Sequence, residues 1–232
     1  MDAAYFKYPH LSSYVYVANN PIRYVDPDGN EIDVSELFKG CEEEGGCENP
    51  QQVVAFIQLL MTEEGSAEVA KYAKAGDSIP MLGITFSEDG QYHREGIDIS
   101  FQGETNMRYK QNSGETKPSI EDGRLKLEVR VNHLGKYPNT ASTLQTFIHE
   151  LFIHARQFSN DFIHNGDLDG SHFSSTKISG IALLGYHHHK RERELGYLKK
   201  YGIPILQAYY TKAGKNVSQE DIINSLYDYR DR

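Results

Sequence analysis

Apolar residues at helical spacing predict the first helix of the chain. Asn49 is a residue type that caps helices well, and Pro50 suits the first helical position. The residues that follow are apolar at intervals of three and four: Val53, Val54, Ile57, Leu60 and Met61. We therefore expect a helix over residues 50–63.

Three segments are expected to form strands: 81–87, 96–102 and 124–132. Apolar and polar residues alternate in the second and third segments, which is typical of a half-buried strand. The apolar members are Ile97, Ile99 and Phe101 in one, and Leu125, Leu127, Val129 and Val131 in the other.

Further helices are predicted over residues 66–74, 141–158 and 176–201. A last helix begins at Ser218, where Asp221 stands three residues on and resembles a capping box. The order is helices, then a small antiparallel sheet, then helices. This order predicts an α+β fold in which the sheet packs against helices.

Composition and charge narrow the class of protein. The chain has 232 residues with 16 Tyr and 10 Phe, enough to build the core of one sizeable domain. A mean hydropathy of −0.60 is on the polar side for such a chain. Its formal net charge of −9 argues against a broad nucleic-acid-binding surface, because an acidic protein repels phosphate.

The two cysteines, Cys41 and Cys47, lie in a Glu- and Gly-rich loop. One disulfide closing this loop and two free thiols both fit the sequence. No apolar run approaches the eighteen residues of a membrane span, and the N-terminus lacks the pattern of a classical signal peptide. Export would then require another route.

The first thirty residues differ from the rest. Turn-forming residues dominate here, and Pro21, Asp26, Pro27 and Gly29 form a Pro-x4-Asp-Pro-x-Gly pattern. With Leu11 to Asn20 before it, this stretch closely resembles the end of the Rhs/YD-repeat core of polymorphic toxins.

This resemblance implies a boundary and a biological setting. Residues 1–30 would be the end of the repeat core, and residues 31–232 a variable effector domain. In that family the domain is often a toxin that is enclosed by the repeats, freed by cleavage at the junction, delivered into a target cell by a specialised secretion system and neutralised by a cognate immunity protein. Asn30 stands where the family often has a large apolar residue, so the resemblance leaves cleavage at Asp26–Gly29 open.

The predicted helix 141–158 carries a candidate metal motif, His149-Glu150-Leu151-Phe152-Ile153-His154. Neutral imidazoles bind zinc, and an adjacent carboxylate can act as general base toward a metal-bound water. The common motif is His-Glu-x-x-His, but here the second histidine is at i+5. Five residues of regular helix turn about 500°, which would point the imidazoles roughly 140° apart.

A π-bulge between Glu150 and His154 would realign the two imidazoles, so we expect a helical irregularity there. The six residues resemble the His-Glu-x-x-x-His motif of dipeptidyl peptidase III, a zinc peptidase. The strand predicted at 124–132 leads into this helix, an arrangement similar to that of zincins. Zinc peptidases commonly have an edge strand beside the metal helix, where substrate can add as another strand.

Zinc also needs a third protein ligand and an open position. We choose His188, because it falls on the apolar stripe of the helix predicted at 176–201. His187, Glu192 and His172 compete for the same role. His164, Asp167 and Asp169 could orient a ligand or could be ordinary polar residues. Tyr186, Tyr197 and Tyr201 could donate a hydrogen bond to an oxyanion or could only pack.

Three functions remain open. The leading expectation is a toxin metallopeptidase, with zinc on His149, His154 and His188, Glu150 as base and a protein in the target cell as substrate. A metal-dependent nuclease toxin of the His-Asn-His type is an alternative, suggested by the run Gly185-Tyr-His-His-His189. A non-enzymatic Rhs tip module, with histidines that only pack, is the third.

Overall fold

The computed structural model describes residues 32–41, 46–79, 82–104, 113–132, 140–165, 196 and 198–228. Within them the chain has the predicted α+β class. The helices are α1 (Pro50–Leu60), α2 (Glu63–Ala70), α3 (Gln91–Arg94), α4 (Thr140–His149), η3 (Glu150–Ala155), α5 (Arg156–Asn165), η5 (Leu198–Gly202), α8 (Ile203–Lys212) and α9 (Gln219–Asp228), where η marks a π-helix.

A four-stranded mixed sheet forms the centre of the fold. Its strands are β1 (Ile32–Asp33), β4 (Ile97–Glu104), β5 (Gly114–Glu121) and β6 (Arg124–Asn132), in the spatial order β1-β4-β6-β5. The first two and β6 are mutually parallel, and β5 runs antiparallel to β6. A separate antiparallel pair joins β2 (Ser78–Ile79) to β3 (Ile84–Thr85).

The parallel pairing of β4 with β6 departs from the antiparallel sheet that the sequence predicted. The reason is β5, a strand that the apolar pattern did not reveal. It reverses the chain between β4 and β6 and forms a hairpin with β6. Asp122 and Gly123 make the turn with φ of 50° and 77°, the left-handed conformation that a two-residue hairpin requires.

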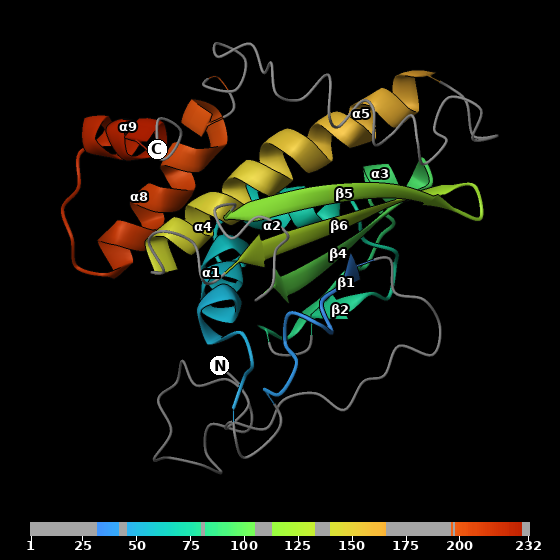
Figure 1. Ribbon diagram of the computed structural model, residues 1–232, viewed down its shortest axis with the longest axis horizontal. Coiled ribbons are helices and arrows are strands. Elements are labelled where there is room, and N and C mark those ends of the chain that lie inside the picture. The colour runs from blue at the N-terminus through green and yellow to red at the C-terminus, as the bar shows by residue number, and fades with distance from the viewer. Residues whose placement is uncertain are drawn as a thin grey trace.

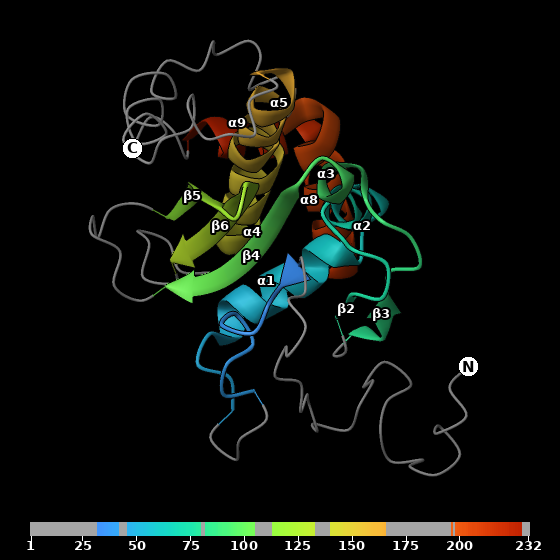
Figure 2. The same ribbon diagram turned by 90° about the vertical axis from the view of Figure 1, so that its right-hand side faces the viewer.

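The helices cover one face of the sheet. The inward side chains of β4 and β6 alternate as predicted, and they pack against α1 and α4. Phe56 of α1 lies between Phe101 of β4 and Phe147 of α4, with ring centroids 4.7 and 5.6 Å away. Figures 1 and 2 show α4 and α5 as one long helical rod lying along this face.

Several helix and strand ends differ from the prediction. The first helix ends at Leu60. The second begins at Glu63 rather than at residue 66, because Thr62 is its N-cap and accepts from Gly65 N–H. The strand expected over 81–87 is reduced to β3. Most of the helix expected over 176–201 lies outside the described residues. The cap at Ser218 is confirmed, since Asp221 N–H donates to its hydroxyl.

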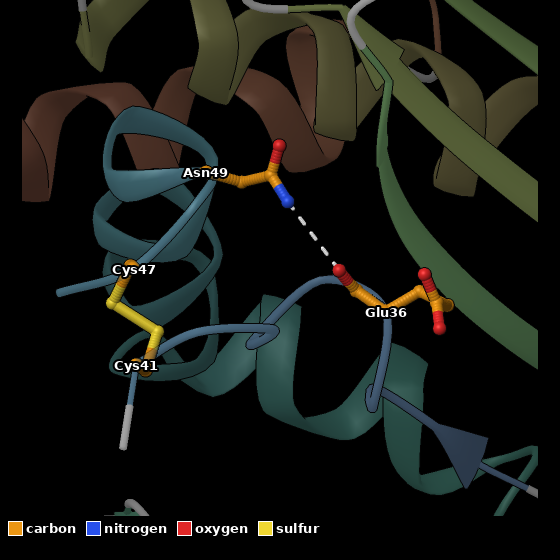
Figure 3. The surroundings of a disulfide bond; sticks show 4 residues. All are labelled: Glu36, Cys41, Cys47 and Asn49. Carbon is orange, nitrogen blue, oxygen red and sulfur yellow. Dashed lines mark hydrogen bonds between the residues drawn. A yellow bond between two sulfur atoms is a disulfide. The ribbon is translucent and has the colours of Figure 1, made fainter. Parts of the chain in front are cut away.

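A disulfide joins Cys41 to Cys47, the first of the two alternatives open from the sequence. It closes the loop just before α1 (Figure 3). Asn49 stands at the N-cap position, but its side chain does not cap the helix. Instead it donates to the main-chain oxygen of Glu36 at 3.3 Å, and so ties the segment after β1 to the start of α1. None of the helices described is long and apolar enough to cross a membrane.

Candidate metal centre

The two histidines of the motif face each other across a π-helical turn. His149 is the last residue of α4, and His154 lies within η3, which spans Glu150–Ala155. The predicted irregularity is therefore confirmed at the predicted place. A π-turn closes its hydrogen bonds five residues apart instead of four, and this brings the i and i+5 side chains to one side of the helix.

The geometry of the imidazole pair suits a shared metal ion. The Nε2 atoms of His149 and His154 lie 3.0 Å apart, and both side chains are half-buried. Two nitrogens bound at zinc distances in tetrahedral geometry would be about 3.3 Å apart. The pair is thus within a few tenths of an ångström of the separation that such an ion needs.

Glu150 adds a buried carboxyl group to this pair. It is 4% exposed, and its Oε2 accepts a hydrogen bond of 2.8 Å from the hydroxyl of Thr116 on β5. Burial raises the pKa of Glu150 to about 8; the bond from Thr116 opposes this rise, and the negative charge of Glu115 adds to it. The carboxyl group of metal-free protein is therefore largely protonated at neutral pH.

Together the three side chains can hold a metal ion. One ligand atom from each of His149, Glu150 and His154 lies within 4.8 Å of the others. In the part of the chain that the structure describes, no other three His, Cys, Asp or Glu side chains bring their ligand atoms close enough together to hold a metal ion. The motif identified from sequence is thus brought together in space.

A buried ion pair holds the end of the π-turn. Arg156 directly follows η3, and its guanidinium donates two hydrogen bonds to the carboxylate of Glu68 on α2. Both side chains are almost fully buried, at 8% and 2% exposed. Breaking such a pair leaves an uncompensated buried charge, so it fixes the metal helix against α2.

The other candidate residues do not join the cluster within the described residues. Tyr201 stacks on Phe152 with ring centroids 5.0 Å apart, and the Arg156 guanidinium lies 4.4 Å from its ring. Hydrogen bonds from Arg156 and Lys200 lower the pKa of the Tyr201 hydroxyl. His164 is exposed, with Nδ1 2.6 Å from the main-chain oxygen of Asn160. The third-ligand candidates and the remaining polar residues of this group lie outside the described residues: His172, His187, His188, Glu192, Asp167, Asp169, Tyr186 and Tyr197.

Comparison with known proteins brings in no relative. No family model, curated protein or solved structure matches the chain.

Sequence reasoning missed two residues that shape the site, Gly114 and Thr116, both on β5. The strand Gly-Glu-Thr-Lys-Pro-Ser-Ile-Glu has no clear apolar alternation, because β5 lies at the edge of the sheet. The Asp122-Gly123 dipeptide before the strand at 124–132 was the available signal. It is typical of a two-residue hairpin turn and predicts a preceding strand.

Proposed function

We propose that residues 31–232 form a zinc-dependent metallopeptidase domain. One observation carries this proposal: the π-turn puts two imidazole nitrogens 3.0 Å apart, with a buried carboxyl group in the same 4.8 Å cluster. Imidazole ligands and a neighbouring acid are the donor set of hydrolytic zinc sites. His188 is the third ligand in this proposal, with His187, Glu192 and His172 as its competitors.

Glu150 is the general base. Zinc, when bound, would lower the pKa of its water toward about 7. Burial raises the pKa of Glu150 to about 8. A cation bound to the imidazoles would lower this pKa, because it favours the ionised form of the adjacent carboxyl group. Glu150 would then take the proton from the water and pass it to the leaving amine. Metal binding and base activation are thus linked.

The edge of β5 is the proposed place for a peptide substrate. Asn132 N–H donates to Ser113 O at 2.8 Å, so these opposite residues form a hydrogen-bonded pair. Alternation along an antiparallel ladder directs the main-chain groups of Gly114, Thr116 and Pro118 away from β6. Proline has no N–H to donate and suits this outward position. A substrate can add here as another strand, beside the metal helix.

The biological setting is proposed from the resemblance of residues 11–29 to the Rhs core. The domain would act as a toxin in a target cell, reach it through a specialised secretion system, and be held in check by a cognate immunity protein. Its substrate would be a protein of that cell.

The test compares four variants of residues 31–232. The wild-type domain is expected to bind one zinc per chain, to arrest growth when expressed in bacteria, and to create new protein N-termini detectable by N-terminal labelling. His149→Ala and His154→Ala should lose stoichiometric zinc and all cleavage. Glu150→Gln should keep zinc and lose about 10²–10⁴-fold in cleavage rate, because the base is gone. The control is His164→Ala, which removes an exposed histidine of the adjoining helix and should change neither the zinc content nor the cleavage rate.

Two outcomes contradict the peptidase. One is wild-type protein without stoichiometric zinc, and the other is growth arrest that survives Glu150→Gln. Nicking of plasmid DNA by the metal-loaded protein, without new protein N-termini, would favour the nuclease instead.

A further inference from the structure

We propose that Thr116 is a positioning residue for Glu150, and that β5 thereby sets the orientation of the base as well as offering an edge to the substrate. This inference rests on the proposed function. Its starting point is a contact between elements far apart in sequence: the Thr116 hydroxyl lies 2.8 Å from Glu150 Oε2 and 3.3 Å from the main-chain oxygen of Glu150.

The hydroxyl of Thr116 is well placed to fix the carboxyl group. Among the described residues, it is the hydrogen-bond partner of the Glu150 side chain. Thr116 is 9% exposed, so solvent competes little for this bond. The β-branched side chain also has few rotamers, which holds the hydroxyl in one direction. One carboxyl oxygen, Oε2, is thereby engaged.

Backbone pairing holds Thr116 itself in place. It lies opposite Val129, in the third of the eight residue pairs between β5 and β6. Val129 is fully buried, so this part of the hairpin is anchored in the core. The position of the Thr116 hydroxyl is therefore determined by the sheet, independently of the π-turn that it contacts.

Gly114 allows the strand to approach this closely. A Cβ atom built at Gly114 would lie 2.9 Å from both Cγ and Oε1 of Glu150, and 2.5 Å from Cγ2 of Thr146. Real Cβ atoms essentially never come that near, so any side chain at 114 would displace the Glu150 carboxyl group, the Thr146 side chain or the strand. Gly114 thus leaves room for the Glu150 carboxyl group, and Thr116 donates a hydrogen bond to the same group.

The contact has a mechanistic consequence. Thr116 belongs to the residues whose main chain faces the outer edge of β5, which is the last strand of the described sheet, and its side chain faces Glu150. One residue therefore connects the proposed substrate strand to the base. Loss of the hydroxyl should impair the chemical step, in which Glu150 must be aimed, and leave binding of both zinc and peptide unchanged.

The decisive variant is Thr116→Val, which removes the hydroxyl and keeps the shape. The probe is a fluorogenic peptide copied from the cleavage site that N-terminal labelling identifies. We expect kcat to fall about ten- to hundredfold, with KM within twofold and zinc content unchanged. Thr116→Ser should return kcat to within about threefold of wild type. Thr85→Val, an exposed threonine on β3, is the matched control and should behave as wild type.

A second readout does not depend on activity. In metal-free protein, the midpoints of urea unfolding for Thr116→Val, Glu150→Gln and the double variant should be non-additive, because the two side chains form one hydrogen bond. Gly114→Ala should reproduce the kcat defect with Thr116 intact.

Each outcome supports or overturns a specific claim. Unchanged kcat in a folded, zinc-loaded Thr116→Val overturns the positioning role and leaves the peptidase standing. A kcat loss that Thr116→Ser does not restore, or additive unfolding midpoints, also overturns it. If wild-type protein shows no hydrolysis that depends on Glu150, the proposed function fails, and the role of Thr116 fails with it.

Discussion

At the scale of single residues, Glu150 combines burial with chemistry. A carboxyl group that is 4% exposed holds its proton more tightly than a carboxyl group in water, and its pKa rises to about 8 although the Thr116 hydroxyl donates to it. In the unfolded chain the same group returns to a pKa of about 4.3. Between these two values, native protein binds more protons at this site than unfolded protein does.

This difference predicts how the stability of metal-free protein depends on pH. Since the native pKa is the higher one, the contribution of Glu150 is fully present below about pH 4 and is lost as pH rises through about 8. Urea unfolding in EDTA should show wild type losing several kcal/mol relative to Glu150→Gln between pH 5 and pH 8.5. Parallel pH profiles for the two proteins would contradict this prediction, and excess zinc should restore the stability of wild type at high pH.

At the scale of secondary-structure elements, the π-turn was predictable from two residues and from nothing else in the helix. The residues of α4 are buried on several sides of the helix. The apolar positions before and after the motif therefore do not define a single face, and a shift of that face across the motif cannot be detected. Only His149 and His154 indicated the irregularity. Two ligands of one metal ion must lie on the same side of the helix, and residues five apart in a regular α-helix do not. A functional constraint therefore revealed a backbone feature that hydrophobic periodicity could not.

Among the strands, hydrophobic periodicity predicted one correctly and missed another. The strand over 124–132 was predicted to the residue, because its inward face is wholly apolar. The edge strand β5 was missed, because most of its side chains are half-buried or exposed and its sequence has no apolar period. Thr116 and Gly114 were missed with it, although the Asp122-Gly123 turn residues indicated a strand before residue 122.

The π-turn makes a prediction about deletions. A π-bulge absorbs one extra residue without changing the phase of the helix on either side. Deleting Ile153 should therefore convert the motif to His-Glu-x-x-His in a regular helix, keep both imidazoles on one face and retain stoichiometric zinc. Loss of one buried apolar side chain should still lower Tm by several degrees.

The matched control deletes Gln145, within the regular helix α4. That deletion rotates the helix residues after position 145 by about 100° relative to those before it. Buried side chains then face solvent, so the protein should not fold. Circular dichroism melts and zinc analysis of the two deletions provide the comparison. If deletion of Ile153 is as damaging as deletion of Gln145, the irregularity is not a one-residue insertion in an otherwise continuous helix.

At the scale of the whole molecule, the segment that follows residue 31 belongs to the core. The described core begins at Ile32, which is 2% exposed and pairs in β1 with Ile99 of β4. Leu37 and Phe38 follow, both nearly fully buried, and Phe38 packs edge-on against Phe56 of α1. The segment after residue 31 is therefore integral to the domain that carries the metal centre.

Truncation tests this boundary and the proposed effector domain together. Removal of residues 1–30 should leave Tm within about 2 °C of the full chain and keep the zinc content, because the deletion spares every residue of the described core. Removal of residues 1–38 deletes β1 and four buried apolar side chains: Ile32, Val34, Leu37 and Phe38. Loss of a large buried side chain costs about 2–5 kcal/mol. Their sum is comparable with the entire stability of a typical domain, about 5–15 kcal/mol, so this protein should not unfold cooperatively. If the shorter truncation also abolishes cooperative unfolding, residues 1–30 belong to the folding unit, and the metal centre is not part of a separable effector domain.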